Sequence, residues 1–336
     1  VYVWTANWPY RHRGNDAAAE PSMLFRLPLD GSSPSALGVD GAPVDQFSFL
    51  ESEDGHINVM VQPEGTGDWM WTAERGPLGA DSLRLLRAPI ARFDAGKARA
   101  EEEWYRALPP PTQGALHNRF VGDHLLYGSG NGWWNTGSEV GSTVFVVPWR
   151  GRSGEVTPLG LPHGVDRIEV MGSDAVVVGA RGGDLHFSGV RLGARPVVAQ
   201  RFVLDSASQG ETRSHGFFYR SDDAGRGILG LPVRGPGRPG WEHLVEGSAS
   251  IVFLRNEARR FTRLGALAPS GVAPVADGCK ASCVDWYGNA RPIFLRGRVL
   301  ALLGYELVEG AVDGAGMWEL RRASFAPEAV RTTLRD

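Results

Sequence analysis

The sequence predicts an all-β protein, and three observations carry this prediction. Almost every apolar stretch is short, rich in β-branched or aromatic residues, and bounded by Gly, Pro, Asn or Asp. The 336 residues include 45 glycines and 22 prolines, which are spread along the chain instead of gathered in one segment. Helical periodicity is nearly absent. Many short strands joined by turns follow from this pattern.

The expected strands form six successive sets, each of roughly the length of one four-stranded propeller blade. The first three sets comprise residues 1–5 and 23–29; 46–50, 56–62, 83–89 and 104–108; and 116–121, 124–127, 143–148 and 156–161. The last three comprise residues 167–171, 175–179, 185–190 and 197–204; 216–220, 227–233, 251–256 and 261–267; and 292–295, 298–308 and 318–325. Residues 94–107 hold good helix formers but no apolar stripe, which indicates a short helix or a decorated loop.

One hairpin pattern recurs, in which a strand, a turn with Gly and a charged or polar neighbour, and a second apolar strand follow each other. It occurs at residues 119–126, 169–176 and 293–300, and Glu53-Asp54-Gly55 gives a further hairpin signal. The prediction is a single domain over residues 1–336, a β-propeller of about six or seven four-stranded blades. A β-sandwich with similar hairpins is the alternative.

Charge and hydropathy argue against two classes of partner. The formal net charge is -3, and acidic and basic residues are interleaved, so no basic field attracts nucleic acid or an anionic membrane surface. No apolar run has the length of a transmembrane segment. The sequence begins at Val1 without an initiator Met or a signal peptide, so we expect a longer chain with sequence before residue 1.

The segment Asp45-Gln46-Phe47-Ser48-Phe49, its acidic turn 51–55 and the strand 56–61 resemble a known group of proteins. With the strand at 23–29 before it and the hairpins 119–127 and 167–178 after it, the segment is similar to secreted bacterial and archaeal proteins that carry a C-terminal β-propeller domain. The resemblance is sharpest around Gln46-Phe47-Ser48. It departs at residues 57–61, where Ile-Asn-Val-Met-Val replaces the family's Arg- and Thr-rich strand. The resemblance implies a propeller and an exported protein, secreted or in the cell envelope, and it implies no particular chemistry.

Cys279 and Cys283 lie four residues apart in the expected long loop 269–283, with no histidine near them in sequence. A small disulfide is the preferred interpretation, and it agrees with an exported location. Two free thiols or a metal or redox pair are the alternatives.

No motif predicts a catalytic residue, a metal site or a cofactor. The eight histidines show no ligand spacing, and Ser129 and Ser188 lack a nucleophile elbow. The stretch 128–132 lacks the ending of a phosphate-binding loop and reads as a propeller loop. Acidic residues such as those at 51–54 and 222–223 are typical of solvated turns, with calcium binding or acid–base chemistry as the alternative.

Eleven tryptophans are more than a core of this size needs, and several lie in expected loops. Loop aromatics suit the binding of proteins or glycans, and packing at blade ends is the alternative. The candidate binding residues are Trp69, Trp71, Trp133, Trp134, Trp241, Trp286 and Tyr287.

The function expected from these features is binding or scaffolding of a protein or glycan at the cell exterior, without enzymatic activity. A propeller hydrolase or lyase with acids converging at a central channel, and a structural subunit of an extracellular assembly, are the alternatives. Because a propeller leaves no long open sheet edge, we expect the set that opens at residues 1–5 to be completed by an upstream strand or by residues 329–334.

Overall fold

The computed structural model describes residues 1–5, 22–63, 82–111, 114–130, 141–151, 154–211, 214–223, 226–234, 250–257, 260–269, 290–304, 306–314 and 316–325. These residues form strands and four short 3-10 helices, and none of them lies in an α-helix. The all-β prediction is therefore confirmed. No helix in these ranges is long and apolar enough to cross a membrane.

The chain divides into two compact units, which are described separately. The first contains residues 1–135 and 140–168, and the second contains residues 136–139 and 169–336. Sheets 1 to 3 belong to the first unit. Sheets 5 and 6 and most of sheet 4 belong to the second.

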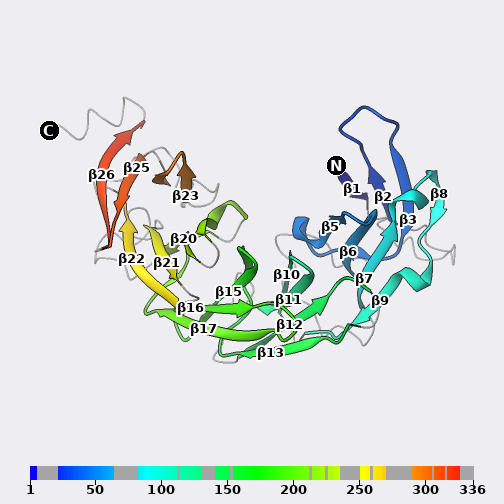
Figure 1. Cartoon of the computed structure of the whole chain (residues 1–336), viewed down its shortest axis with the longest axis horizontal. Coiled ribbons are helices and arrows are strands. Elements are labelled where there is room, and N and C mark those ends of the chain that lie inside the picture. The colour runs from blue at the N-terminus through cyan, green and yellow to red at the C-terminus, as the bar shows by residue number, and fades with distance from the viewer. Residues whose placement is uncertain are drawn as a thin grey trace, which may run out of the picture. The chain divides into compact units, whose positions relative to one another are not determined.

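In the first unit, each sheet is named by its place along the chain (Figure 1). Sheet 1 contains β1 (Tyr2–Thr5), β2 (Ser22–Arg26), β3 (Ser35–Val39) and β8 (Ala95–Arg99). Sheet 2 contains β4 (Ala42–Pro43), β5 (Phe49–Ser52), β6 (His56–Gln62), β7 (Leu83–Pro89) and β9 (Tyr105–Leu108). Sheet 3 contains β10 (Ala115–Val121), β11 (His124–Gly130), β12 (Ser142–Pro148) and β13 (Thr157–Leu161).

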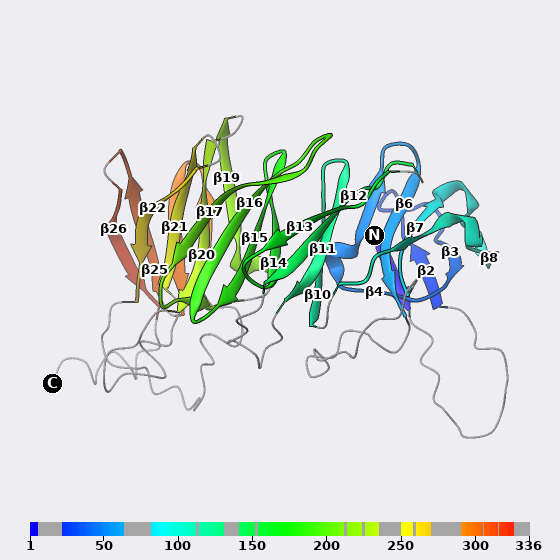
Figure 2. The same cartoon turned by 90° about the horizontal axis from the view of Figure 1, so that it is seen from below.

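The second unit repeats the same plan, and Figure 2 shows its strands running side by side within each sheet. Sheet 4 contains β14 (Arg167–Met171), β15 (Asp174–Arg181), β16 (Asp184–Arg191) and β17 (Val197–Leu204). Sheet 5 contains β18 (Ser208–Gln209), β19 (Phe218–Asp223), β20 (Arg226–Arg234), β21 (Ser250–Glu257) and β22 (Arg260–Leu267). Sheet 6 contains β23 (Ala290–Leu295), β24 (Arg298–Leu303), β25 (Glu306–Val312) and β26 (Met317–Ser324).

Successive sheets within a unit bury apolar side chains against each other. In the first unit, one core joins sheet 1 to sheet 2 through residues such as Leu37 and Val59, and another joins sheet 2 to sheet 3 through Leu85 and Leu125. In the second unit, sheets 4 and 5 share a core, and so do sheets 5 and 6. Six separate sheets of this kind do not match the two sheets of a β-sandwich.

The recurring hairpin is confirmed in all three places. It joins the first two strands of sheets 3, 4 and 6. In sheet 3 the pair Val121 and His124 closes the turn, and in sheet 6 the pair Leu295 and Arg298 does so. Gly122 and Gly297 have φ of 53° and 78°, the left-handed region that two-residue hairpin turns require.

The expectation of a strand over residues 46–50 is wrong in its first half. Residues Gln46–Ser48 form the 3-10 helix η1, and the strand β5 begins only at Phe49. The cause is a capping box, in which the Asp45 carboxylate accepts from the N–H of Phe47 at 2.7 Å and the Ser48 hydroxyl accepts from the N–H of Asp45 at 3.1 Å.

The expectation of a helix or loop over residues 94–107 is also wrong. This segment contains β8, the 3-10 helix η3 (Glu102–Trp104) and the start of β9. The carboxylate of Asp94 accepts from the N–H groups of Gly96, Lys97 and Ala98 at 2.8 to 3.0 Å, which turns the chain into β8. These hydrogen bonds lower the pKa of Asp94, with the bond to Ala98 the largest cause.

Strand β8 pairs in parallel with β3 and gives sheet 1 its fourth strand (Figure 1). β3 lies in a stretch that carries no expected strand. The fourth described strand of sheet 1 thus comes from within the chain, between β7 and β9 of sheet 2. Completion of the set by an upstream strand or by residues 329–334, beside β1, stays a prediction. Residues 329–334 lie outside the described residues.

One further expected strand, residues 298–308, is two strands in the structure. The chain turns at Gly304, whose φ is 58°, between β24 and β25. Sheet 6 therefore has four strands.

A buried carboxylate joins three strands of sheet 6. Glu309 of β25 is buried and forms ion pairs with Arg298 of β24 and Arg321 of β26. Hydrogen bonds from these two guanidinium groups lower the pKa of Glu309 to about 2.

The capping box also joins sheet 2 to sheet 3. Asn118 of β10 is only 3% exposed, and its Nδ2 donates to Asp45 Oδ1 and to Ser48 Oγ, both at 3.1 Å. Removing a buried amide that satisfies two acceptors leaves those acceptors without a donor from sheet 3.

We expect Asn118→Ala to lower the free energy of unfolding by about 1 to 3 kcal/mol, because Asp45 and Ser48 each lose one of their hydrogen-bond donors and the buried space of the amide is left empty. Urea denaturation measures the change. Thr143→Ala is the control in the same sheet, because the Thr143 side chain makes no hydrogen bond to a described residue. The control is expected to change stability by at most about 0.5 kcal/mol. Equal losses in the two variants would show that the amide does not join the sheets.

Candidate functional site

The candidate site is a cavity of about 360 Å³ in the first unit, on the face of sheet 2 that packs against sheet 3. Strand alternation places Leu85, Arg87 and Pro89 of β7 on this face. Cross-strand pairing brings His56 of β6 beside Pro89, and Arg106 of β9 beside Leu85. The full lining is His56, Leu85, Arg87, Pro89, Glu103, Trp104, Tyr105, Arg106, Trp149 and Gly151.

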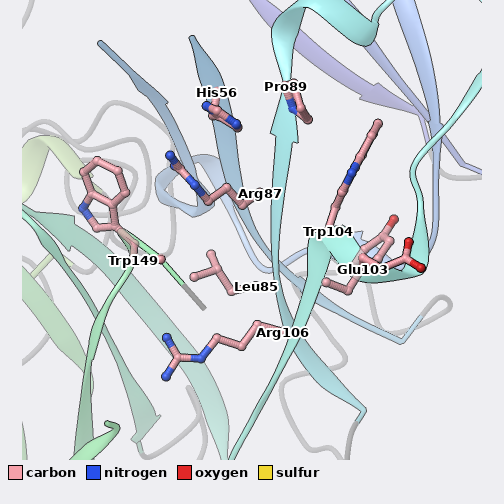
Figure 3. A pocket seen from close by; sticks show the side chains of 10 residues that line it. His56, Leu85, Arg87, Pro89, Glu103, Trp104, Arg106 and Trp149 are labelled. Carbon is pink, nitrogen blue, oxygen red and sulfur yellow. The ribbon is translucent and has the colours of Figure 1, made fainter. Parts of the chain in front are cut away.

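Figure 3 shows how the lining residues lie around the cavity. The guanidinium groups of Arg87 and Arg106 extend toward the side on which Trp149 lies. Trp104 and Glu103 lie on the opposite side of β7. One side of β7 therefore holds the two guanidinium groups and Trp149, and the other side holds Trp104 and Glu103.

Trp149 follows β12 and is fixed in place by sheet 3. Its indole Nε1 donates to the carbonyl oxygen of Gly122 at 2.8 Å, and the side chain is 3% exposed. The guanidinium carbons of Arg150 and Arg87 lie 4.7 and 5.5 Å from the centre of its ring. Such cation–π contacts make the indole a rigid wall of the cavity.

Arg87 is held by polar groups of the acidic turn and of β6. It forms an ion pair with Asp54, and its Nη1 donates to Asn58 Oδ1 at 2.8 Å. Asn58 is fully buried and donates in turn to the carbonyl of Leu50 and to the hydroxyl of Ser52, both at 3.1 Å. The hydrogen bond from Ser52, followed by the interactions with Arg87, lowers the pKa of Asp54 to about 2.

Arg106 differs from the other arginines around the cavity. Its guanidinium donates to the carbonyl oxygens of Pro148, at 3.1 Å, and of Gly154. Burial lowers the pKa of Arg106 from its ordinary value. An arginine remains charged at neutral pH despite such a shift.

The remaining lining residues come from η3 and the start of β9, and of these Trp104 and Tyr105 also pack on the core that sheet 2 shares with sheet 1. Trp104 is half-buried, and the guanidinium carbon of Arg92 lies 5.4 Å from the centre of its ring. Tyr105 accepts a hydrogen bond from the N–H of Asp40 at 2.8 Å, and its burial raises the pKa of the phenol to about 12. Glu103 is exposed at the rim.

This arrangement is suited to binding. Rigid aromatic and guanidinium groups converge on a cavity of the size that small ligands occupy. Within the described ranges, no group of three or more His, Cys, Asp or Glu side chains is placed to hold a metal ion.

A second group of ionisable side chains lies near the first strand of sheet 3. Burial, followed by the charge of Arg167, lowers the pKa of His117 to about 4. The imidazole is therefore neutral at physiological pH, next to a cation.

The residues expected to bind a ligand lie outside the described residues. These are Trp69, Trp71, Trp133, Trp134, Trp241, Trp286 and Tyr287, and Cys279 and Cys283 lie outside them as well. Residues 128–130, interpreted as part of a loop, belong to β11 in the structure. Ser129 and Ser188 are buried within strands.

Sequence reasoning did not single out the residues that line the cavity. Arg87 and Asp54 are 33 positions apart and meet only through the pairing of β6 with β7. The acidic turn 51–55, which contains Asp54, is visible in the sequence. Strand alternation in residues 83–89 is the sequence signal that places Leu85, Arg87 and Pro89 on one face of the strand.

The comparisons with known proteins give no family for this chain. No family model matches it, and no curated protein matches it. Solved structures with similarity include the β-propeller domain of the trilobed protease from Pyrococcus furiosus, with 7% identity and a TM-score of 0.33, covering 83% of this chain and 84% of that one. Another is the endo-arabinase from Bacteroides thetaiotaomicron, with 10% identity and a TM-score of 0.28, covering 86% of this chain and 98% of that one. At such TM-scores, neither protein's activity bears on this chain.

We expect the contribution of Asp54 to stability to depend on pH. Its pKa is about 2 in the folded protein and ordinarily 3.8, so its stabilising effect is present above pH 3.8 and is lost as the pH falls toward 2. The side chain is 40% exposed, so the effect is at most about 1 kcal/mol. Denaturation of the wild type and of Asp54→Asn at pH 5 and at pH 2 measures it. The difference between them should shrink at pH 2, and a constant difference would contradict this assignment.

Proposed function

We propose that this chain is a non-enzymatic β-propeller that binds a protein or glycan ligand through the cavity between sheets 2 and 3. The observation that carries the proposal is the lining, in which a fixed indole, a half-buried indole and two arginines surround about 360 Å³ of space. Aromatic and arginine side chains are the types that contribute most to binding interfaces.

The propeller part of the proposal rests on the sheets themselves. Six sheets follow one another along the chain, except that β8 of sheet 1 lies between two strands of sheet 2, and each sheet contains a run of antiparallel strands. Within each unit, neighbouring sheets pack face to face through apolar cores. This repetition is typical of propeller blades, and it supports six blades.

An exported location, secreted or in the cell envelope, is part of the same proposal. It rests on the resemblance of residues 45–61 and on the spacing of Cys279 and Cys283. Intact-mass measurement after alkylation without a reductant tests the expected disulfide. No alkyl addition is the expected result, and two additions would show free thiols.

The binding function is tested by filling the cavity. Glu103 is exposed at its rim, so Glu103→Trp places a bulky side chain there without disturbing a core. We expect ligands found on glycan and peptide arrays to bind this variant at least ~10-fold more weakly, a loss of about 1.4 kcal/mol.

Two control variants separate the possible causes of a loss. Lys97→Trp adds the same bulk on exposed β8, which does not line the cavity, and Glu103→Gln removes the charge without adding bulk. Both are expected to keep binding within about threefold. If no array ligand binds, or if Glu103→Trp binds as the wild type does, the proposed function is wrong.

A further inference from the structure

Arg87 of the lining, and three arginines that contact aromatic lining residues, each have a carboxylate partner. Arg84 pairs with Glu102, Arg87 with Asp54, Arg92 with Glu101, and Arg150 with Asp123. Their charges are therefore balanced within the protein. Against this background Arg106, the fifth guanidinium of the region, is exceptional.

Among the described residues, no carboxylate pairs with Arg106. Its partners are two main-chain carbonyls, those of Pro148 and Gly154, which are neutral. A guanidinium has five N–H groups, so three N–H groups are not engaged by these two bonds. The side chain is half-buried and lines the cavity.

A half-buried cation without a counter-charge has lost part of its hydration, and it is stabilised when an anion occupies the space beside it. The two carbonyl bonds hold the guanidinium between sheets 2 and 3 and fix its orientation. A fixed planar fork matches a carboxylate, which accepts two parallel N–H bonds. The acidic residue of the lining, Glu103, lies on the other side of β7 and is exposed to water (Figure 3).

We infer that the cavity recognises a carboxylate group of its ligand, and that Arg106 is the residue that binds it. The inference rests on the proposed binding function and deepens it by naming the chemical class of the ligand. The volume of about 360 Å³ fits one acidic sugar or one acidic side chain, and both sources present the same carboxylate.

Two pairs of probes test the inference and distinguish the two sources. One pair is methyl β-glucuronide and methyl β-glucoside, and the other is N-acetylglutamate methylamide and N-acetylglutamine methylamide. Within each pair the carboxylate is the main difference. Titration followed by NMR of the full chain measures the dissociation constants at low and at high salt.

We expect at least one acidic probe to bind ~10-fold or more tightly than its neutral partner, and to bind more weakly at high salt. The pair that shows the preference identifies the source of the carboxylate. Arg106→Gln should abolish the preference, and Arg106→Lys, which keeps the charge but not the fork, should retain part of it. Arg99→Gln removes the same charge from exposed β8, outside the cavity, and should leave the preference unchanged.

Equal binding of acidic and neutral probes, or no binding of either acid, would overturn the inference. So would an unchanged preference in Arg106→Gln. None of these results contradicts the proposed binding function, provided that the ligands found on arrays still bind Glu103→Trp more weakly than they bind the wild type. Because the preference is measured first on the wild type, a variant that fails to fold does not prevent the test.

Discussion

Sheet 3 is held against sheet 2 by a shared apolar core and by a small buried network of hydrogen bonds around the capping box of Asp45 and Ser48. Asn118 reaches from the first strand of sheet 3 and donates to both members of the box. The same two sheets supply the walls of the cavity, with Arg87 and Arg106 on one sheet and Trp149 on the other. The site is therefore built on strands that the network and the shared core hold in register, which is the rigid support that a binding site requires.

Charge balance distinguishes the two kinds of arginine at this site. Arg87 and Arg150 have carboxylate partners, which balance their charges within the protein. Within the part of the chain that the structure describes, the partners of Arg106 are neutral carbonyls, which orient the guanidinium but do not balance its charge. Partial burial of a charged group carries a desolvation cost, and burial lowers the pKa of Arg106 for this reason.

Local patterns predicted most strands and the repeated hairpins, because short apolar runs between turn residues have few other interpretations. These patterns gave the wrong element where an aspartate side chain accepts hydrogen bonds from backbone N–H groups that follow it. Asp45 turned the start of an apparent strand into η1, and Asp94 led an apparent helix into β8. The cavity could not be predicted, because Arg87, Arg106 and Trp149 meet only through strand pairing and sheet packing. The tryptophans chosen from composition lie elsewhere in the sequence, outside the described residues.

Because β8 belongs to sheet 1 but lies within the chain segment of sheet 2, the two sheets cannot be duplicated or deleted independently in evolution. Sheets 3, 4, 5 and 6 are each made from one continuous segment, so a gene could gain or lose such a sheet as a self-contained block. Sheet 1 takes its last strand from the interior of sheet 2, between β7 and β9. Cutting the chain between β3 and β4 would leave the first sheet one strand short and the second with an unpaired insertion. The two sheets are therefore expected to duplicate, to be lost and to unfold together, as one module of double size.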